Sequence, residues 1–357
     1  MRLLMLAAAS SVHTMRWANA FVQRGVEVHL LSLHDPVNGL DGAVRLHRLP
    51  YRGGLGYLSD RPAYSSLVRT IRPDVINAHY ATGYGTLARG CGDVPLVLNV
   101  WGSDVYDFPG KSPFHRWWLL RNLRGVDHIV STSEAMATRT KGLGSGLPPI
   151  TVVPFGVDTK IFSPAVEGPP ARDGEVVIGT VKSLTPTYGV DTLVKAFAEL
   201  LRYPEGQHAR LRIVGRGAQQ EELEQLVRSL GIEDRVRFVG AVPHVQVPDE
   251  LRKLDVFVAL SREESFGVAV IEASSCGLPV LVSDAGGLPE VVEHEVTGAV
   301  VRRDDPIAAA DRLRALVSSK DLRHRWGAAG RAMVIERYEW SACVDRMVQV
   351  LEQVSSR

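Results

Sequence analysis

The sequence predicts an α/β protein made of two Rossmann-like domains, each with a doubly wound parallel sheet covered by helices. Short apolar runs of strand length alternate with segments of helical periodicity along the whole chain. This alternation pauses in a stretch rich in proline and glycine between residues 155 and 175, and then restarts. With 357 residues, the chain is also longer than one ordinary α/β core requires.

The alternation defines a first domain at 1–158, a linker at 159–174 and a second domain at 175–335. A helix from Thr14 to Arg24 is predicted to end at Gly25. The final segment, 336–357, is predicted to be a helix that packs back on the first domain. Strands are expected at 2–8, 27–33, 44–50, 74–79, 95–100, 128–133 and 150–154, and then at 175–181, 210–215, 235–240, 256–261, 279–283 and 298–301. In such folds ligands bind beyond the carboxyl ends of the strands.

The composition excludes several classes of protein. Forty-one basic and forty acidic residues leave a formal charge of +1, so neither a polybasic nucleic-acid binder nor an acidic tail is indicated. Three distant cysteines, Cys91, Cys276 and Cys343, have no metal-ligand spacing and are expected to be reduced thiols. The apolar start of the chain is interpreted as a buried strand rather than a signal peptide, and no apolar run reaches the ~20 residues of a membrane span. A cytoplasmic protein is therefore expected, with its oligomeric state open.

The densest chemical signal lies at 261–272, after the strand predicted at 256–261. Glu264 and Glu272 are eight residues apart, which corresponds to a rise of ~12 Å along a helix. That rise is outside the ~5–9.5 Å expected for the two carboxyls of a glycoside hydrolase. A division of labour fits better: Glu264 in the loop, and Glu272 two turns into a helix that begins near Phe266 or Gly267, where exposed amides form an anion site. Ordinary acidic helix-capping residues are the alternative.

This segment resembles the E-x7-E signature of the family 4 retaining glycosyltransferases, which have the GT-B fold of two Rossmann-like domains facing across a cleft. Further matches in the expected order are the Gly-Gly loop at 283–290, the turn at 295–298, the linker entry at 153–158 with Phe162, and the glycine loop at 213–217. Together the matching runs cover nearly all of the chain from Ser10 to Gly298.

The resemblance implies a hexosyltransferase-like enzyme that moves a sugar, with retention of anomeric configuration, from a nucleotide diphosphate to an acceptor hydroxyl of a glycan, glycolipid or natural-product precursor. It implies no cofactor and no metal in the catalytic step, with UDP and GDP as the favoured nucleotides. Glu264 would contact the transferred sugar and Glu272 the ribose. The donor-binding residues would be Ser183, Gly215, Arg216, Gly217, Val242, Ser265, Phe266, Gly267, Val268 and Glu272.

A departing diphosphate gains negative charge, so its site requires a cation. Family members place a basic residue just after the first strand of the second domain, and Lys182 matches that position. A lysine a few residues later is also usual, but here residues 186–189 read Pro-Thr-Tyr-Gly. Arg216 or Arg262 is the candidate replacement. The alternative for Lys182 is an ordinary surface charge.

Candidates in the first domain follow predicted strand ends. Trp101 stands where family members often carry a histidine, and a tryptophan there either stacks on a sugar or belongs to the core. Asp104 is a candidate polar contact with the acceptor. His79 ends the strand at 74–79 and is a candidate catalytic group, with a structural histidine as the alternative. Ser11 and His13 complete the predicted acceptor site, in a loop that lacks the paired glycines usual for the family.

The segment 115–124 is basic, aromatic and predicted to be helical. Such a helix can lie at the inner face of a membrane and bring the enzyme to lipid-linked acceptors. A helix packed on the sheet with outward arginines is the alternative.

Three rival functions follow from the same sequence. A nucleotide-sugar epimerase or a glycan phosphorylase would use the same fold. A non-catalytic sugar-nucleotide binder is suggested by the missing lysine near Tyr188. An NAD-dependent oxidoreductase is disfavoured, because no G-x-G-x-x-G follows the first strand and the Gly215-x-Gly217 loop lacks the third glycine.

Overall fold

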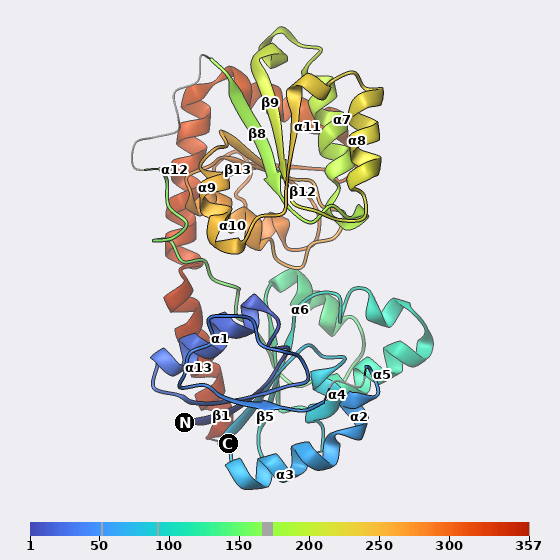
Figure 1. Cartoon of the computed structure of the whole chain (residues 1–357), viewed down its shortest axis with the longest axis vertical. Coiled ribbons are helices and arrows are strands. Elements are labelled where there is room, and N and C mark those ends of the chain that lie inside the picture. The colour runs from blue at the N-terminus through green and yellow to red at the C-terminus, as the bar shows by residue number, and fades with distance from the viewer. Residues whose placement is uncertain (51–52, 91–92, 166–173, 357) are drawn as a thin grey trace. The chain divides into compact units, whose positions relative to one another are not determined.

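The computed structural model describes residues 1–50, 53–90, 93–165 and 174–356. These residues form two compact units, one comprising 1–154 with 341–357 and the other 155–340 (Figure 1). The unit boundary thus lies at Pro154/Phe155, whereas the sequence analysis places the first boundary at 158. Residues 166–173, half of the linker expected at 159–174, lie outside the described residues, as does Cys91.

The first unit contains a parallel sheet of seven strands in the order β3-β2-β1-β4-β5-β6-β7. Its strands are β1 (Arg2–Leu6), β2 (Glu27–Ser32), β3 (Arg45–Arg48), β4 (Val75–His79), β5 (Leu96–Val100), β6 (His128–Ser131) and β7 (Ile150–Val152). Its helices are α1 (Val12–Gln23), α2 (Gly56–Ser59), α3 (Arg61–Ile71), α4 (Tyr84–Ala88), α5 (Pro113–Leu123), α6 (Glu134–Lys141) and α13 (Trp340–Ser355), with a 3-10 turn at Phe108–Gly110. Every strand predicted for this half is present.

The second unit contains a parallel sheet of six strands in the order β10-β9-β8-β11-β12-β13. Its strands are β8 (Val176–Val181), β9 (Ala209–Val214), β10 (Val236–Gly240), β11 (Val256–Ala259), β12 (Val280–Ser283) and β13 (Gly298–Val301). Its helices are α7 (Val190–Leu200), α8 (Gln220–Ser229), α9 (Val247–Leu251), α10 (Val268–Ser275), α11 (Pro306–Ser318) and α12 (Lys320–Arg337). Short 3-10 turns lie at Pro186–Tyr188, Pro204–His208, Glu233–Arg235, His244–Gln246 and Leu288–Glu290.

Each sheet is buried between helices, which explains why the strands are continuous apolar runs rather than alternating ones. In the second unit, α7, α8 and α11 lie on one side of the sheet and α9, α10 and α12 on the other (Figure 1). Helix starts follow local capping: Ser133 and Ser319 accept backbone hydrogen bonds from the first turns of α6 and α12. Gly25 and Gly231 follow α1 and α8 with φ of +74° and +66°, as helix-ending glycines do. The predicted α/β fold class of two parallel-sheet domains is confirmed.

Candidate active site

The strand order of the second unit locates a ligand site. The order in which successive strands join the sheet reverses between β8 and β11, and ligands of open α/β sheets bind at the carboxyl ends of strands at such a point. Lys182 is the first residue after β8, and Glu264 lies in the loop after β11. Although 82 positions separate the two residues, the fold brings them together at this point.

Lys182 and Glu264 form a largely buried ion pair. Lys182 Nζ lies 2.5 Å from Glu264 Oε2, and the two side chains are only 9% and 12% exposed. Ser261 Oγ donates to the same carboxylate oxygen at 3.4 Å. Lys182 Nζ also lies 4.8 Å from the ring centroid of Tyr188. Tyr188 lies in the segment where a second lysine is usual. Its ring contacts the ammonium group of Lys182 and adds no second cation.

Glycines in two loops allow the backbone to pack closely around this ion pair. A Cβ on Gly215 would lie 1.8 Å from the carbonyl oxygen of Lys182, and one on Gly217 would lie 2.1 Å from that of Leu184. A Cβ on Gly286 would lie 1.9 Å from the carbonyl oxygen of Glu264. The amide that follows Gly286 donates to that same carbonyl at 3.0 Å. The glycine loops therefore have a packing role, because they fix the backbones from which the lysine and the glutamate project.

Helix α10 begins next to this pair, with its amides directed out of the helix start. Gly267 is the N-terminal cap at φ +104°, and in the described part of the chain no group accepts from the amides of Gly267 or Val268. Such unsatisfied amides, at the positive end of the helix dipole, favour an anion. Phe266 is buried and its ring packs 5.6 Å from that of Tyr338, so only its backbone is available to a ligand. Ser265 is half-buried in the same loop.

Glu272 lies one turn into α10, not two as the sequence analysis predicted, because the helix begins at Val268. Its side chain is buried, and its Oε1 lies 3.1 Å from Nε2 of His244. His244 is half-exposed in the loop after β10, where Val242 also lies. Sequence reasoning missed His244, although a polar residue just after a strand end was the available signal. The pair orients one carboxylate oxygen at this edge of the sheet.

The two arginines proposed to replace the missing lysine differ in their surroundings. Arg262 binds both carboxylate oxygens of Asp191 at 2.9 Å and lies 2.8 Å from Asp304. The hydrogen bonds with Asp191 raise the pKa of this guanidinium. Arg262 therefore ties loops together and is not the replacement. Arg216 is exposed after β9, and no residue that the structure describes forms an ion pair with it, so Arg216 remains the candidate replacement. Ser183, the residue after Lys182, is also exposed.

The first unit also places its candidates where its strand order reverses, between β1 and β4. The rings of His13 and His79 lie 6.1 Å and 4.8 Å from that of Trp101, which is half-buried. His79 is only 2% exposed, and burial lowers its pKa to about 3. His79 is thus a neutral imidazole near neutral pH, and the catalytic role that the sequence suggested for it stays a prediction. Ser11 is half-buried at the start of α1.

Asp104 binds the backbone of its own loops, and its predicted contact with the acceptor stays a prediction. Its buried carboxylate accepts hydrogen bonds from the amides of Ala81 at 2.9 Å, Gly102 at 2.9 Å and Trp101 at 3.2 Å. Burial raises the pKa of this carboxyl, and the amide hydrogen bonds oppose the shift. Asp104 thus holds together the loops after β4 and β5, which carry Trp101.

Helix α5 (Pro113–Leu123) contains most of the basic, aromatic segment. Phe114 and Trp117 are 60% and 52% exposed, with ring centroids 5.8 Å apart. The guanidinium of Arg121 lies 5.6 Å from the Trp117 ring. Buried Leu119 and Leu123 attach the helix to the core, so packing on the sheet and an exposed aromatic face occur together. In the residues described, no helix is long and apolar enough to cross a membrane.

Two family models together match most of the chain. The model of the family described as glycosyl transferases group 1 matches residues 165–333, and that described as glycosyl transferase 4-like matches residues 2–133.

Among similar proteins are two D-inositol 3-phosphate glycosyltransferases. That of Xylanimonas cellulosilytica is 29% identical over 400 aligned residues, covering 98% of this chain and 93% of that protein. That of Corynebacterium jeikeium is 30% identical, covering 79% and 72%. The GDP-mannose-dependent alpha-(1-6)-phosphatidylinositol monomannoside mannosyltransferase of Mycobacterium tuberculosis is 30% identical, covering 67% and 65%.

Solved structures share the fold. Sucrose-phosphate synthase from Thermosynechococcus elongatus superposes with a TM-score of 0.86 at 21% identity, covering 100% of this chain and 99% of that one. Anabaena HepE in complex with UDP and glucose superposes with a TM-score of 0.82 at 21% identity, covering 99% and 100%.

Fold, site and matches together define an enzyme of the glycosyltransferase class with the GT-B fold. The chain belongs to the family 4 glycosyltransferases, as the sequence analysis predicted from its E-x7-E segment. The epimerase, phosphorylase, oxidoreductase and non-catalytic alternatives are not favoured by these matches.

Proposed function

We propose that this enzyme transfers a sugar from a nucleotide diphosphate to an acceptor hydroxyl with retention of anomeric configuration. The observation that carries the proposal is the buried Lys182–Glu264 pair beside the unsatisfied amides of α10, at the reversal point of the second sheet. In this proposal the second unit binds the donor and the first unit binds the acceptor. UDP and GDP are the nucleotides proposed.

Each donor group has a matching partner. The amides of Gly267 and Val268 receive the diphosphate, and Lys182 offsets the negative charge that grows on it as the glycosidic bond breaks. The carboxylate of Glu264 accepts a hydrogen bond from a hydroxyl of the sugar, and its ion pair with Lys182 weakens in return. Glu272, oriented by His244, accepts hydrogen bonds from the ribose.

The proposed step forms the bond between the acceptor oxygen and the anomeric carbon on the face that the diphosphate leaves. The bond from that carbon to the diphosphate oxygen breaks, and the acceptor proton passes to a diphosphate oxygen. No protein side chain is required as a strong base. This is consistent with His79, which is buried and neutral and is proposed to position Trp101 rather than to transfer a proton.

For the acceptor we propose a phosphorylated inositol or an inositol lipid, following the names of the similar proteins. Trp101, His13 and Ser11 are its proposed contacts, with Asp104 holding the loop. For a lipid acceptor, Phe114 and Trp117 supply an exposed aromatic face, and the neighbouring arginines supply the positive charge that anionic membranes attract. We propose peripheral contact of α5 with such a membrane.

The test combines purified enzyme with UDP- and GDP-sugars, each with inositol 3-phosphate or with phosphatidylinositol in vesicles. Proton NMR of the product reports the anomeric configuration. The proposal expects an acceptor-dependent product with the configuration of the donor. An inverted product, or conversion of the donor that ignores every acceptor, would contradict it. Sedimentation with anionic vesicles, compared between wild type and Phe114→Ser/Trp117→Ser, tests the membrane contact, and equal binding of both would remove it.

A further inference from the structure

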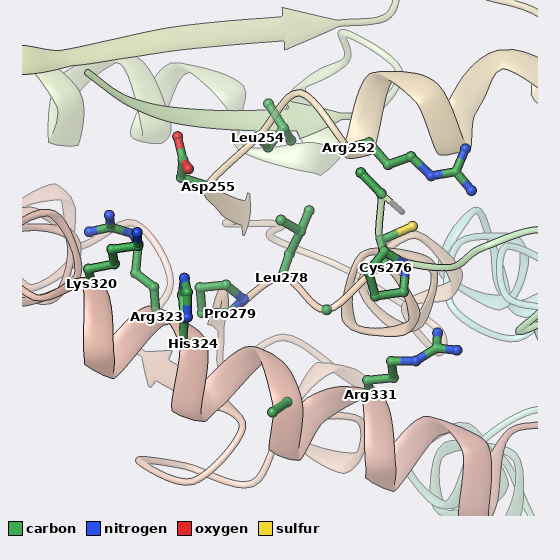
Figure 2. Close-up of a pocket in the computed structure, with 14 residues that line it drawn as sticks. Arg252, Leu254, Asp255, Cys276, Leu278, Pro279, Lys320, Arg323, His324 and Arg331 are labelled. Atoms are coloured by element: carbon green, nitrogen blue, oxygen red, sulfur yellow. The ribbon is translucent and has the colours of Figure 1, made fainter. Parts of the chain in front are cut away.

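The second unit contains a pocket of about 480 Å³ that no part of the proposed reaction uses. Leu254 and Asp255 immediately precede β11, and Leu278 and Pro279 immediately precede β12, so this pocket lies at the amino ends of the strands. The proposed donor site lies at their carboxyl ends. Helix α12 forms the opposite wall of the pocket (Figure 2). No lining residue belongs to the proposed donor site.

The lining of this pocket is strongly cationic. Arg252, Lys320, Arg323 and Arg331 face a single carboxylate, that of Asp255. One oxygen of that carboxylate already accepts the amide of Val177 at 2.7 Å. Asp249, outside the lining, offsets part of the charge of Arg252. Four permanent positive charges still exceed these two negative ones in a concave site, so the local potential attracts an anion.

Two of the three arginines, Arg323 and Arg331, are held in place by backbone carbonyls, whereas Arg252 also has a charged partner. Arg323 donates to the carbonyl of Leu316 at 2.7 Å, and Arg331 donates to the carbonyl of Ser275. Arg252 donates to the carbonyls of Ile161 and Ser163 and also pairs with Asp249. Carbonyl acceptors orient a guanidinium without neutralising it, and each guanidinium carries five donors. The pocket therefore keeps most of its positive charge.

Lys320 and His324 line the pocket without a protein partner for their charge in the part of the chain that is described. They lie one turn apart at the start of α12, both exposed, and neither has a hydrogen bond or ion pair with any residue the structure describes. A lysine in the first turn of a helix is opposed by the helix dipole, which favours acidic residues there. Both side chains are therefore free to contact an anionic ligand in the pocket.

Figure 2 shows how the charges are distributed. Lys320, Arg323 and His324 gather toward one end of the pocket, Arg252 and Arg331 toward the other, and Leu278 and Pro279 lie between them. We propose that this pocket binds a small, elongated organic anion with phosphate groups at its two ends and a less polar body. Its volume is in the range of ordinary small-molecule sites.

Isothermal titration calorimetry of the full chain with fructose 1,6-bisphosphate as the probe tests this site. The expected result is one site per chain, with inorganic phosphate binding at least ~10-fold more weakly because it reaches only one end. Lys320→Glu/His324→Ala is expected to weaken bisphosphate binding by at least ~10-fold, since charge-assisted hydrogen bonds are lost. Arg325→Glu, a charge reversal at a residue of the same helix that does not line the pocket, is the matched control and is expected to bind as wild type.

Two outcomes overturn the proposal. One is no binding of the bisphosphate at millimolar concentration. The other is binding that survives Lys320→Glu/His324→Ala but disappears in Lys182→Ala, which would locate the anion in the donor site. Misfolding does not imitate the expected result, because an acidic residue at the start of α12 is favoured by the helix dipole. Thermal denaturation of each variant checks this directly.

Discussion

The Lys182–Glu264 pair provides the sharpest separation of a catalytic role from a structural one. Both side chains are about nine-tenths buried, so removal of one partner leaves an uncompensated buried charge. Such a loss costs about 3–5 kcal/mol of folding free energy. For a folding unit of this size each kcal/mol corresponds to roughly 2–4 °C, so Lys182→Met alone is expected to lower Tm by about 10 °C.

The double variant Lys182→Met/Glu264→Gln is expected to recover thermal stability but not turnover. It replaces the pair by uncharged groups of similar volume, which is often close to neutral for stability, so most of the lost Tm is expected to return. Turnover is expected to stay at least ~100-fold below wild type, because the cation that stabilises the departing diphosphate is gone. The assays are differential scanning calorimetry and steady-state transfer of a radiolabelled sugar.

Two results would refute this reasoning. Near-normal turnover in the double variant would show that the Lys182–Glu264 pair is purely structural. An unchanged Tm in Lys182→Met would show that the charges are not buried against each other.

Three further predictions concern His244 and Gly286 in the second unit and His79 in the first. His244→Ala is expected to raise the KM for the donor about 10-fold with little change in kcat, because His244 only orients Glu272. His244→Gln should restore part of the lost donor affinity. An equal effect of His244→Ala on kcat would contradict this role. Gly286→Ala is expected to lower the free energy of unfolding by several kcal/mol, because its Cβ would overlap a carbonyl oxygen. Gly231→Ala has positive φ but open space around it, so it should lower that free energy by only about 1–2 kcal/mol, measured by urea denaturation. Equal losses in the two variants would refute the packing role of Gly286. Burial lowers the pKa of His79 to about 3 in the folded state, below its unfolded value, so its stabilising contribution is present above pH 6.5 and is lost as pH falls. From pH 7 to pH 5 the free energy of unfolding should therefore fall by up to ~2 kcal/mol more in wild type than in His79→Asn. Identical pH profiles of stability would contradict the burial of His79.

The fold could be predicted because buried parallel strands leave a direct trace in the sequence. Runs such as 256–261 and 279–283 are apolar throughout, and glycines such as Gly25 mark helix ends. Strand positions were correct in both halves. The start of α10 was predicted within two residues, which was still enough to misplace Glu272 by one turn.

The candidate site could be predicted only as a set of residues, not as a set of contacts. Sequence patterns place Lys182 and Glu264 at strand ends, but their pairing depends on strand order. The same limit applies to Arg262, which is occupied by Asp191 from a distant loop. Asp104 looked like a ligand contact because a polar residue after a strand is usually exposed, whereas here it satisfies buried amides.

The central claim is that a nucleoside diphosphate binds against the start of α10. A crystal structure of the enzyme with UDP or GDP measures this most directly. It should show diphosphate oxygens within hydrogen-bonding distance of the Gly267 and Val268 amides, with Lys182 Nζ turned toward them and Glu272 on the ribose. A nucleotide bound elsewhere in the second unit, with the Lys182–Glu264 pair unchanged, would contradict the claim.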